Sequence, residues 1–233
     1  YQPSPKQYRS SLSAIIKRSA KKNMKKISGF LLLSMLAVQG LVAQKTIDWN
    51  KRMEPAFTQW VSGFGFNTVN NSGTQFKDLT NADHYAFGKT PFFGSVETNI
   101  AHRWKVKGVM SLNYFTDGKI FDGQTIKGKS AGGNDAGYWS MDVLASYYFL
   151  GDETYEPYLS TGMGLSHFGD YVTQENPLLY VTPTEMVTFN LGFGIRIWFS
   201  EHWGLNLDAL GKWGMGAGNT NHHQSHLGVL YKI

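Results

Sequence analysis

The feature that most constrains this chain is a strict alternation of side-chain character between residues 187 and 198. Large apolar residues occupy every second position: Val187, Phe189, Leu191, Phe193, Ile195 and Ile197. The positions between them carry Thr188, Asn190, Gly192, Gly194, Arg196 and Trp198. Successive side chains of a β-strand point to opposite faces. The segment therefore predicts a strand with one apolar face and one face that is mostly small or polar.

The same alternation recurs along the chain and predicts eight strands. Their ranges are 57–67, 92–101, 105–115, 139–149, 157–167, 187–198, 205–213 and 223–233. A strand of about ten residues is long enough to cross a bilayer at a tilt. Between the strands, long connections at 68–91, 116–137, 168–185 and 214–222 alternate with short ones. This sorting is typical of outer-membrane barrels, in which short periplasmic turns alternate with long external loops.

The chemistry of the two strand faces favours a membrane barrel. One face carries large apolar and aromatic side chains, whereas the other carries glycine, serine and charges of both signs. Small residues and paired charges suit the narrow interior of an eight-stranded barrel, and aromatic residues near strand ends suit interfacial girdles. We predict an all-β fold, an eight-stranded antiparallel up-and-down transmembrane β-barrel over residues 44–233. The alternative is a soluble secreted lipid-carrier barrel or a β-sandwich, with the apolar face turned inward.

The basic residues are concentrated at the N-terminal end of the chain. Residues 1–44 contain eight Lys or Arg and no Asp or Glu, whereas the remainder contains 14 basic and 17 acidic residues. Met24-Lys25-Lys26 precedes an apolar run that closes at Ala43, which is the pattern of a secretory signal peptide. We expect this signal peptide over 24–43, preceded by an unstructured upstream extension over 1–23. No basic stripe remains without these segments, so the sequence does not favour nucleic-acid binding.

The charged side chains on the small-residue face are the main candidate site. The alternation places them in the lumen, and they are Glu97, Lys105, Lys107, Asp142, Arg196, Asp208 and Lys212. Because an unpaired charge in a narrow interior is destabilised by several kcal/mol, we expect these residues to pair. The pairs form either a plug that fills the barrel or an ion gate, in which an exchange of partners opens a narrow water path. A general porin channel is not expected, since eight strands enclose too little space.

Three histidines near the C-terminus are a second candidate. His222, His223 and His226 are close enough in sequence to suggest a metal site, but a strand places His223 and His226 on opposite faces. We interpret the three as polar rim residues of the last external loop. No metal is therefore expected. No cofactor is expected either, because the Gly-x-Gly pairs lie within predicted strands and lack the helix that a nucleotide-binding loop requires.

Three stretches carry a likeness to a known family. They are Val42-Ala43-Gln44, the segment from Tyr155 to Leu165 and the segment from Asn221 to Ile233. Over most of residues 45–233, the chain resembles outer-membrane β-barrel proteins of the OmpA-like superfamily, especially those of Bacteroidetes, with the barrel domain alone matched. The resemblance implies a place in the outer membrane of a Gram-negative cell, within the wider porin family. It also implies contact with outer-membrane lipid and lipopolysaccharide, and insertion by the barrel assembly machinery.

The pattern and the resemblance together predict a non-enzymatic barrel. The expected role is envelope stabilisation, interaction with a surface partner through the loops, or a minor gated conductance. The loops are polar and partly rich in glycine, so we expect mobile segments without a preformed pocket.

An enzymatic alternative is a lipid-modifying barrel. His223-Gln-Ser225 resembles the His-x-Ser arrangement of lipid A deacylases of the PagL type. Triad chemistry also needs a third group that holds the imidazole. No acid follows His223 in this sequence, so the match to that family is incomplete.

Overall fold

The structure is a computed structural model that describes residues 57–73, 81–127, 136–150, 154–174, 180–181, 184–216 and 220–233. The predicted upstream extension (1–23) and signal peptide (24–43) lie outside these residues. Among the described residues, no helix is long and apolar enough to cross a membrane.

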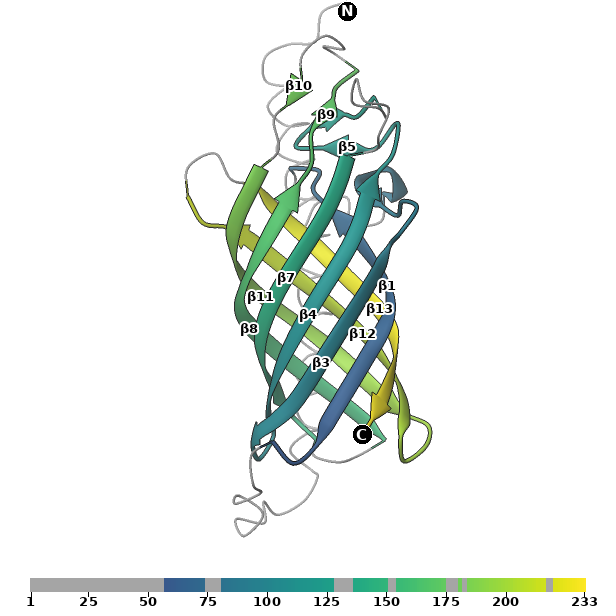
Figure 1. Cartoon of the computed structure of the whole chain (residues 1–233), viewed down its shortest axis with the longest axis vertical. Helices are drawn as coiled ribbons and strands as arrows, with labels where there is room; N and C mark the ends of the chain where they lie inside the picture. Colours follow the sequence, from purple (N-terminus) through teal and green to yellow (C-terminus); the bar gives the residue numbers. More distant parts are fainter. Residues whose placement is uncertain are drawn as a thin grey trace, which may run out of the picture. The chain divides into compact units, whose positions relative to one another are not determined.

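Eight long strands close into an antiparallel barrel (Figure 1). They are β1 (Trp60–Asn70), β3 (Phe92–Ala101), β4 (Trp104–Phe115), β7 (Ala136–Tyr148), β8 (Tyr155–Phe168), β11 (Thr184–Trp198), β12 (Trp203–Gly214) and β13 (Asn221–Lys232). Each long strand pairs with the next one along the chain, and β1 pairs with β13 to close the sheet. The predicted eight-stranded, antiparallel, up-and-down topology is confirmed.

The connections are sorted by length between the two ends of the barrel. The turn His102–Arg103 joins β3 to β4 with only two residues between the paired positions Ala101 and Trp104. Arg103 there has φ 63°, the left-handed conformation that tight hairpin turns require. The C-terminus lies at this end, which we call the short-turn end (Figure 1). The opposite end, called the loop end, carries the long connections that the sequence predicts.

The apolar face of the strands points out of the barrel. Phe64, Val143 and Phe193 are 63%, 63% and 66% exposed, whereas the inward-facing Thr188 and Asn190 are 0% exposed. Large apolar side chains therefore form the outer wall, and polar side chains are enclosed. This is the arrangement predicted for a membrane barrel, and it is the reverse of the soluble lipid-carrier alternative.

The inner face combines polar residues with an apolar layer and with glycines. The apolar layer contains Phe93, Val109, Leu144 and Leu210. Gly65 marks a close approach between β1 and β13, because a Cβ atom there would overlap the backbone of Leu227 and Gly228. The barrel interior is thus packed with side chains, as is expected when only eight strands enclose it.

Short strands form an ordered cap at the loop end. Beside β2 (Tyr85–Ala86) and the 3₁₀ turn η2 (Ala82–His84), the cap contains β5 (Ile120–Phe121), β6 (Gln124–Thr125), β9 (Tyr171–Val172) and β10 (Tyr180–Val181). β5 pairs with β6 and β9 with β10, and an isolated bridge joins Ile126 to Thr173. We call residues 120–126, 171–173 and 180–181 the loop cap.

An aromatic cluster holds the loop cap on the barrel. The Phe121 ring lies 5.0 Å from that of Phe168 and 4.7 Å from that of Tyr171, measured between centroids. Burial, with a smaller effect from the Asp122 carboxylate, raises the pKa of Tyr171 to about 12. The protonated phenol is therefore favoured in the folded cap, and this stabilisation is lost as the pH rises from about 10 towards 12.

The cap is more ordered than the mobile loops that the sequence predicted. Over its described residues, the buried apolar side chains of Phe121, Ile126 and Tyr171 join the strand ends in one cluster. Two-residue strands show too little alternation to be recognised in a sequence. The glycines of 116–137 therefore predicted a mobile loop, although apolar residues order the described part of this segment.

Gly65→Val tests the closure of the barrel. The larger side chain forces β1 away from the β13 backbone, so we expect the free energy of unfolding to fall by about 3 kcal/mol or more. The unheated variant should also lose the fast gel mobility of a closed barrel. Gly108→Val is the matched control, because the nearest atom to its added Cβ is 3.9 Å away, on the outer face. Equal loss in both variants would contradict the closure.

Candidate functional site

All seven charged residues predicted for the lumen point into the barrel. Six of them are at most 4% exposed: Glu97, Lys107, Asp142, Arg196, Asp208 and Lys212. The side chain of Lys105, nearest the short-turn end, is 11% exposed. Each contributes to an ion pair, and the pairs form three clusters along the lumen.

The first cluster lies near the short-turn end. The Arg196 guanidinium donates to the Glu97 carboxylate, which also accepts from the Tyr148 hydroxyl at 3.1 and 3.2 Å. The Arg196 guanidinium lies over the Tyr148 ring, 4.8 Å from its centroid. Lys105 Nζ lies 4.0 Å from Glu156 Oε2. The cluster thus combines two ion pairs with a cation–π contact in an enclosed space.

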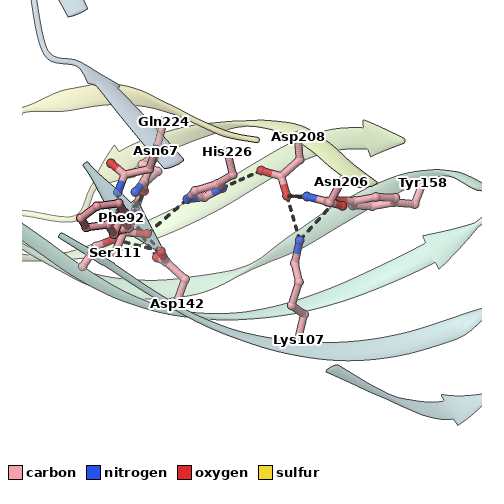
Figure 2. A network of polar contacts seen from close by, with 12 residues as sticks. Asn67, Phe92, Lys107, Ser111, Asp142, Tyr158, Asn206, Asp208, Gln224 and His226 are labelled. Atoms are coloured by element: carbon pink, nitrogen blue, oxygen red, sulfur yellow. Dashed lines mark hydrogen bonds and ion pairs between the residues drawn. The ribbon is translucent and has the colours of Figure 1, made fainter. Parts of the chain in front are cut away.

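The second cluster is centred on Asp208 (Figure 2). Its Oδ2 accepts from Lys107 Nζ at 3.0 Å, from Tyr158 Oη at 2.9 Å and from Asn206 Nδ2 at 2.9 Å. Its Oδ1 lies 2.6 Å from His226 Nδ1. Four side chains from β4, β8, β12 and β13 therefore satisfy one carboxylate, and they connect strands on different sides of the barrel.

The third cluster is centred on Asp142. Lys212 Nζ lies 2.8 Å from Asp142 Oδ1, and Asn190 Nδ2 donates to the same oxygen at 2.7 Å. Lys212 also donates to Gln224 Oε1 at 3.2 Å. The Ser140 hydroxyl donates to Asp142 Oδ2 at 3.2 Å. The buried charge is thus paired and hydrogen-bonded, which is the condition for a tolerable desolvation cost.

Glu156 is a lumen acid that the sequence reasoning missed. It lies on the inner face of β8 and is 2% exposed. With Glu156 the network contains four acids and four bases, so its formal charge is balanced when histidine is neutral. The predicted strand began at residue 157, whereas β8 begins at Tyr155. Extending the alternation by two residues would have placed Glu156 in line with Tyr158 and Ser160.

The interpretation of His222 and His226 as rim residues is wrong. Both are 1% exposed and lie inside the barrel. His222 belongs to β13, which begins at Asn221, before the predicted strand start at residue 223. His222 Nε2 lies 3.2 Å from Tyr138 Oη. His223 lies on the other face of the strand, as predicted. Among the described residues, no group of three or more His, Cys, Asp or Glu is placed to hold a metal ion.

Ser111, His226 and Asp208 have the connectivity of a Ser-His-Asp relay (Figure 2). The Ser111 hydroxyl lies 3.2 Å from His226 Nε2. Since a carboxylate only accepts, the proton of a neutral His226 lies on Nδ1 and faces Asp208. However, Ser111 is 0% exposed, and Phe93 packs on the imidazole at 4.6 Å between ring centroids. A substrate carbonyl has no access to this hydroxyl, so we assign the three residues to packing.

His223 and Ser225 face outward on β13, where their cross-strand neighbours decide whether an acid lies opposite them. Across the two neighbouring strands, His223 is paired with Asn70 and Gly211. Ser225 is paired with Thr68 and Ala209. None of these four cross-strand partners is a carboxylate.

Comparisons with known proteins agree with the barrel. No family model matches the chain, and no curated protein matches its sequence. The N-terminal β-barrel domain of Pseudomonas aeruginosa OprF matches with a TM-score of 0.51 and 13% identity, over 76% of this chain and 99% of that domain. The attachment invasion locus protein Ail of Yersinia pestis matches with a TM-score of 0.47 and 12% identity, over 77% of this chain and 100% of Ail.

Neisserial surface protein A gives a similar result. Its TM-score is 0.47 with 12% identity, over 77% of this chain and 99% of that protein. At such identities, a structural likeness reports the fold alone. The match to the OprF domain supports the assignment of the described part of this chain to the outer-membrane type of β-barrel fold.

Arg196→Met tests the energetics of the first cluster. Removal of the guanidinium leaves the buried Glu97 without its ion-pair partner, and we expect the free energy of unfolding to fall by about 3–5 kcal/mol. The double variant Glu97→Met/Arg196→Met should recover most of this loss, because the isolated charge is gone. Urea unfolding in lipid vesicles, followed by tryptophan fluorescence, measures both. A double variant less stable than the single one would contradict the pairing.

Proposed function

We propose that the protein is a non-enzymatic outer-membrane barrel that stabilises the envelope and presents its loop end to the exterior. The observation that carries this proposal is the distribution of side chains. An apolar outer wall encloses a lumen filled by four acids and four bases that pair with one another. Such a barrel is built to be stable in lipid and closed to solutes.

The packing of the lumen argues against a porin. Ser140, Ser146 and Gln224 on its inner face are 0% exposed, and the three charged clusters cross-link different strands through the interior. An eight-stranded barrel leaves little space beyond its own side chains. We therefore expect the resting protein to offer no open path for solutes.

An enzymatic role has less support. A lipid-modifying barrel needs a nucleophile, a base and an orienting acid at the lipid surface. His223 and Ser225 lack a carboxylate opposite them on either neighbouring strand. The relay-like Ser111 is enclosed in the lumen.

The proposed environment is the outer membrane of a Gram-negative cell. Its lipid and lipopolysaccharide would contact the apolar wall, and the barrel assembly machinery would insert the chain. Membership of the OmpA-like superfamily, of the Bacteroidetes type, and the signal peptide over 24–43 stay predictions. The loops over 68–91, 116–137 and 168–185 would carry a surface partner, with the loop cap as their ordered base.

A minor gated conductance is the second candidate. The Arg196 guanidinium lies 4.8 Å from the Tyr148 ring centroid and 5.7 Å from that of Tyr158. Tyr158 donates to Asp208, so the first and second clusters are in contact. A change of partners between them would open the narrowest charged part of the lumen.

Membrane fractionation followed by bilayer recording tests the proposed function. The full chain should fractionate with the outer membrane, and unheated samples should migrate faster than boiled ones. The purified barrel should add no steady current to a planar bilayer, because its lumen is filled. Recovery in the soluble periplasm would contradict the membrane role. A steady current would contradict the closed lumen, whereas brief openings that disappear in Arg196→Met would favour the gate.

A further inference from the structure

His222 lies where the charged lumen meets the aromatic cluster that holds the loop cap. The centroid of its ring is 5.1 Å from that of Phe168, and the Phe168 centroid is 5.0 Å from that of Phe121 in the cap. His222 Nε2 lies 3.2 Å from Tyr138 Oη, which also accepts from Lys212 Nζ at 3.4 Å. One imidazole therefore links the third charged cluster to the apolar contacts that order the cap.

The start of β13 is tied to the cap by a second route. The Asn71 side chain donates to Thr220 Oγ1 at 3.0 Å, two residues before His222. The Asn71 carbonyl accepts from the backbone N–H of Asp122, in the turn between β5 and β6, at 2.6 Å. A shift at this strand end would therefore act on the cap through two separate sets of contacts.

The two enclosed imidazoles of β13 have opposite electrostatic surroundings. His226 Nδ1 lies 2.6 Å from an oxygen of Asp208, so a carboxylate compensates a proton added to that ring. The charged groups that act on His222 are cations. They are Lys212, its partner across the β12–β13 pair, and the neighbouring His223 when that ring is protonated.

The other elements packed against His222 add no free negative charge in the described part of the chain. Asp142 of β7 is already paired with Lys212. The remaining neighbours are uncharged: Tyr138 of β7, Ser166 and Phe168 of β8 and Asn70 of β1. A protonated imidazole carries N–H on both nitrogens, so His222 would donate to the Tyr138 oxygen that Lys212 also uses. Two enclosed cations would then share one neutral acceptor, which disfavours the charged ring.

We propose that His222 is an acid-sensitive latch of the loop cap. At neutral pH the uncharged ring packs against Phe168, and the cap is closed. In acid, a ring that is exposed by transient opening takes up a proton and cannot return to its place beside Lys212. The buried aromatic cluster at the loop end then opens to solvent. This role goes beyond the proposed structural function, because it gives the loop end two states.

The size of the effect follows from proton linkage. A solvent-exposed imidazole has a pKa of about 6.5. Below this pH the open form binds one proton more than the closed form, so the closed cap loses stability as the pH falls. Because the closed form holds the ring neutral, the equilibrium constant for opening rises about 30-fold between pH 7.5 and pH 5.

The test is amide hydrogen exchange in the full chain in lipid nanodiscs, followed by nuclear magnetic resonance at pH 7.5 and pH 5. Protection factors, which correct for the intrinsic effect of pH on exchange, report the opening of the cap. The reporters are the N–H groups of Asp122, Ile126 and Gln174, which donate to Asn71, Lys119 and Thr125. We expect their protection to fall about 30-fold at pH 5, while amides at the centres of β4 and β7 keep theirs.

His222→Gln and His223→Gln form a matched pair of variants on β13. Glutamine at position 222 is polar but gains no charge in acid, so the cap amides of this variant should lose most of their pH response. His223→Gln removes the outward-facing ring and should keep most of the response. Fast gel mobility of the unheated samples confirms that each variant is a closed barrel.

A second measurement needs no variant. The ring ¹⁵N signals of His222 in the unaltered protein follow its protonation directly. We expect this protonation over the same pH range in which the cap amides lose protection. A protonated His222 beneath fully protected cap amides would overturn the proposal.

Two further results would also overturn the latch. Equal protection of the cap amides at both pH values shows that acid does not open the cap. A full pH response in folded His222→Gln shows that another titrating group opens it. None of these results bears on barrel closure or membrane location, so the proposed function is tested separately.

Discussion

The pairing of β1 with β13 is the constraint on which the rest of the structure depends. A sheet in hydrocarbon has no tolerable edge, because unpaired backbone groups there find no water. The first and last strands of this barrel pair from Val61 opposite Lys232 to Asn70 opposite His223. This contact links parts of the chain that are far apart in sequence. Once it is made, the ring of eight strands defines an interior of fixed width.

The fixed width explains the composition of the lumen. Large side chains on one strand face small ones on the next: a Cβ atom at Gly194 would lie 2.5 Å from the Tyr158 ring. Tyr158 in turn reaches Asp208, and Tyr148 reaches Glu97. Glycine on the inner face thus provides the space in which tyrosines and ion pairs meet. The polar interior is stable because nearly every charge has an ion-pair partner. These ion pairs also link strands that are not neighbours in the sheet.

Much of this architecture follows from the sequence alone, because alternation is a local property. The eight strands, the outward apolar face and seven lumen charges were all predicted from it. The partners of those charges were not, since pairs such as Lys107 and Asp208 depend on the register of strands distant in the chain. Glu156 and His222 were missed for another reason. Both lie at strand ends, where the alternation merges with turn residues and the boundary is ambiguous by a few positions.

The loop cap shows a further limit of sequence reasoning. Its strands are two residues long, and its order comes from aromatic contacts such as Phe121 with Phe168 and Tyr171. These contacts join separate loops, so no periodicity within one loop announces them. Glycine and polar residues in the same segments predicted mobile loops instead.

The central claim is that the alternate faces of each strand meet lipid and a filled lumen. The chain contains no cysteine, so single cysteines at successive positions of β11 can carry spin labels in lipid bilayers. We predict that accessibility to dissolved oxygen alternates, high at Val187, Phe189 and Leu191 and low at Thr188 and Asn190. Uniform accessibility, or a maximum at Thr188 and Asn190, would contradict the membrane barrel described here.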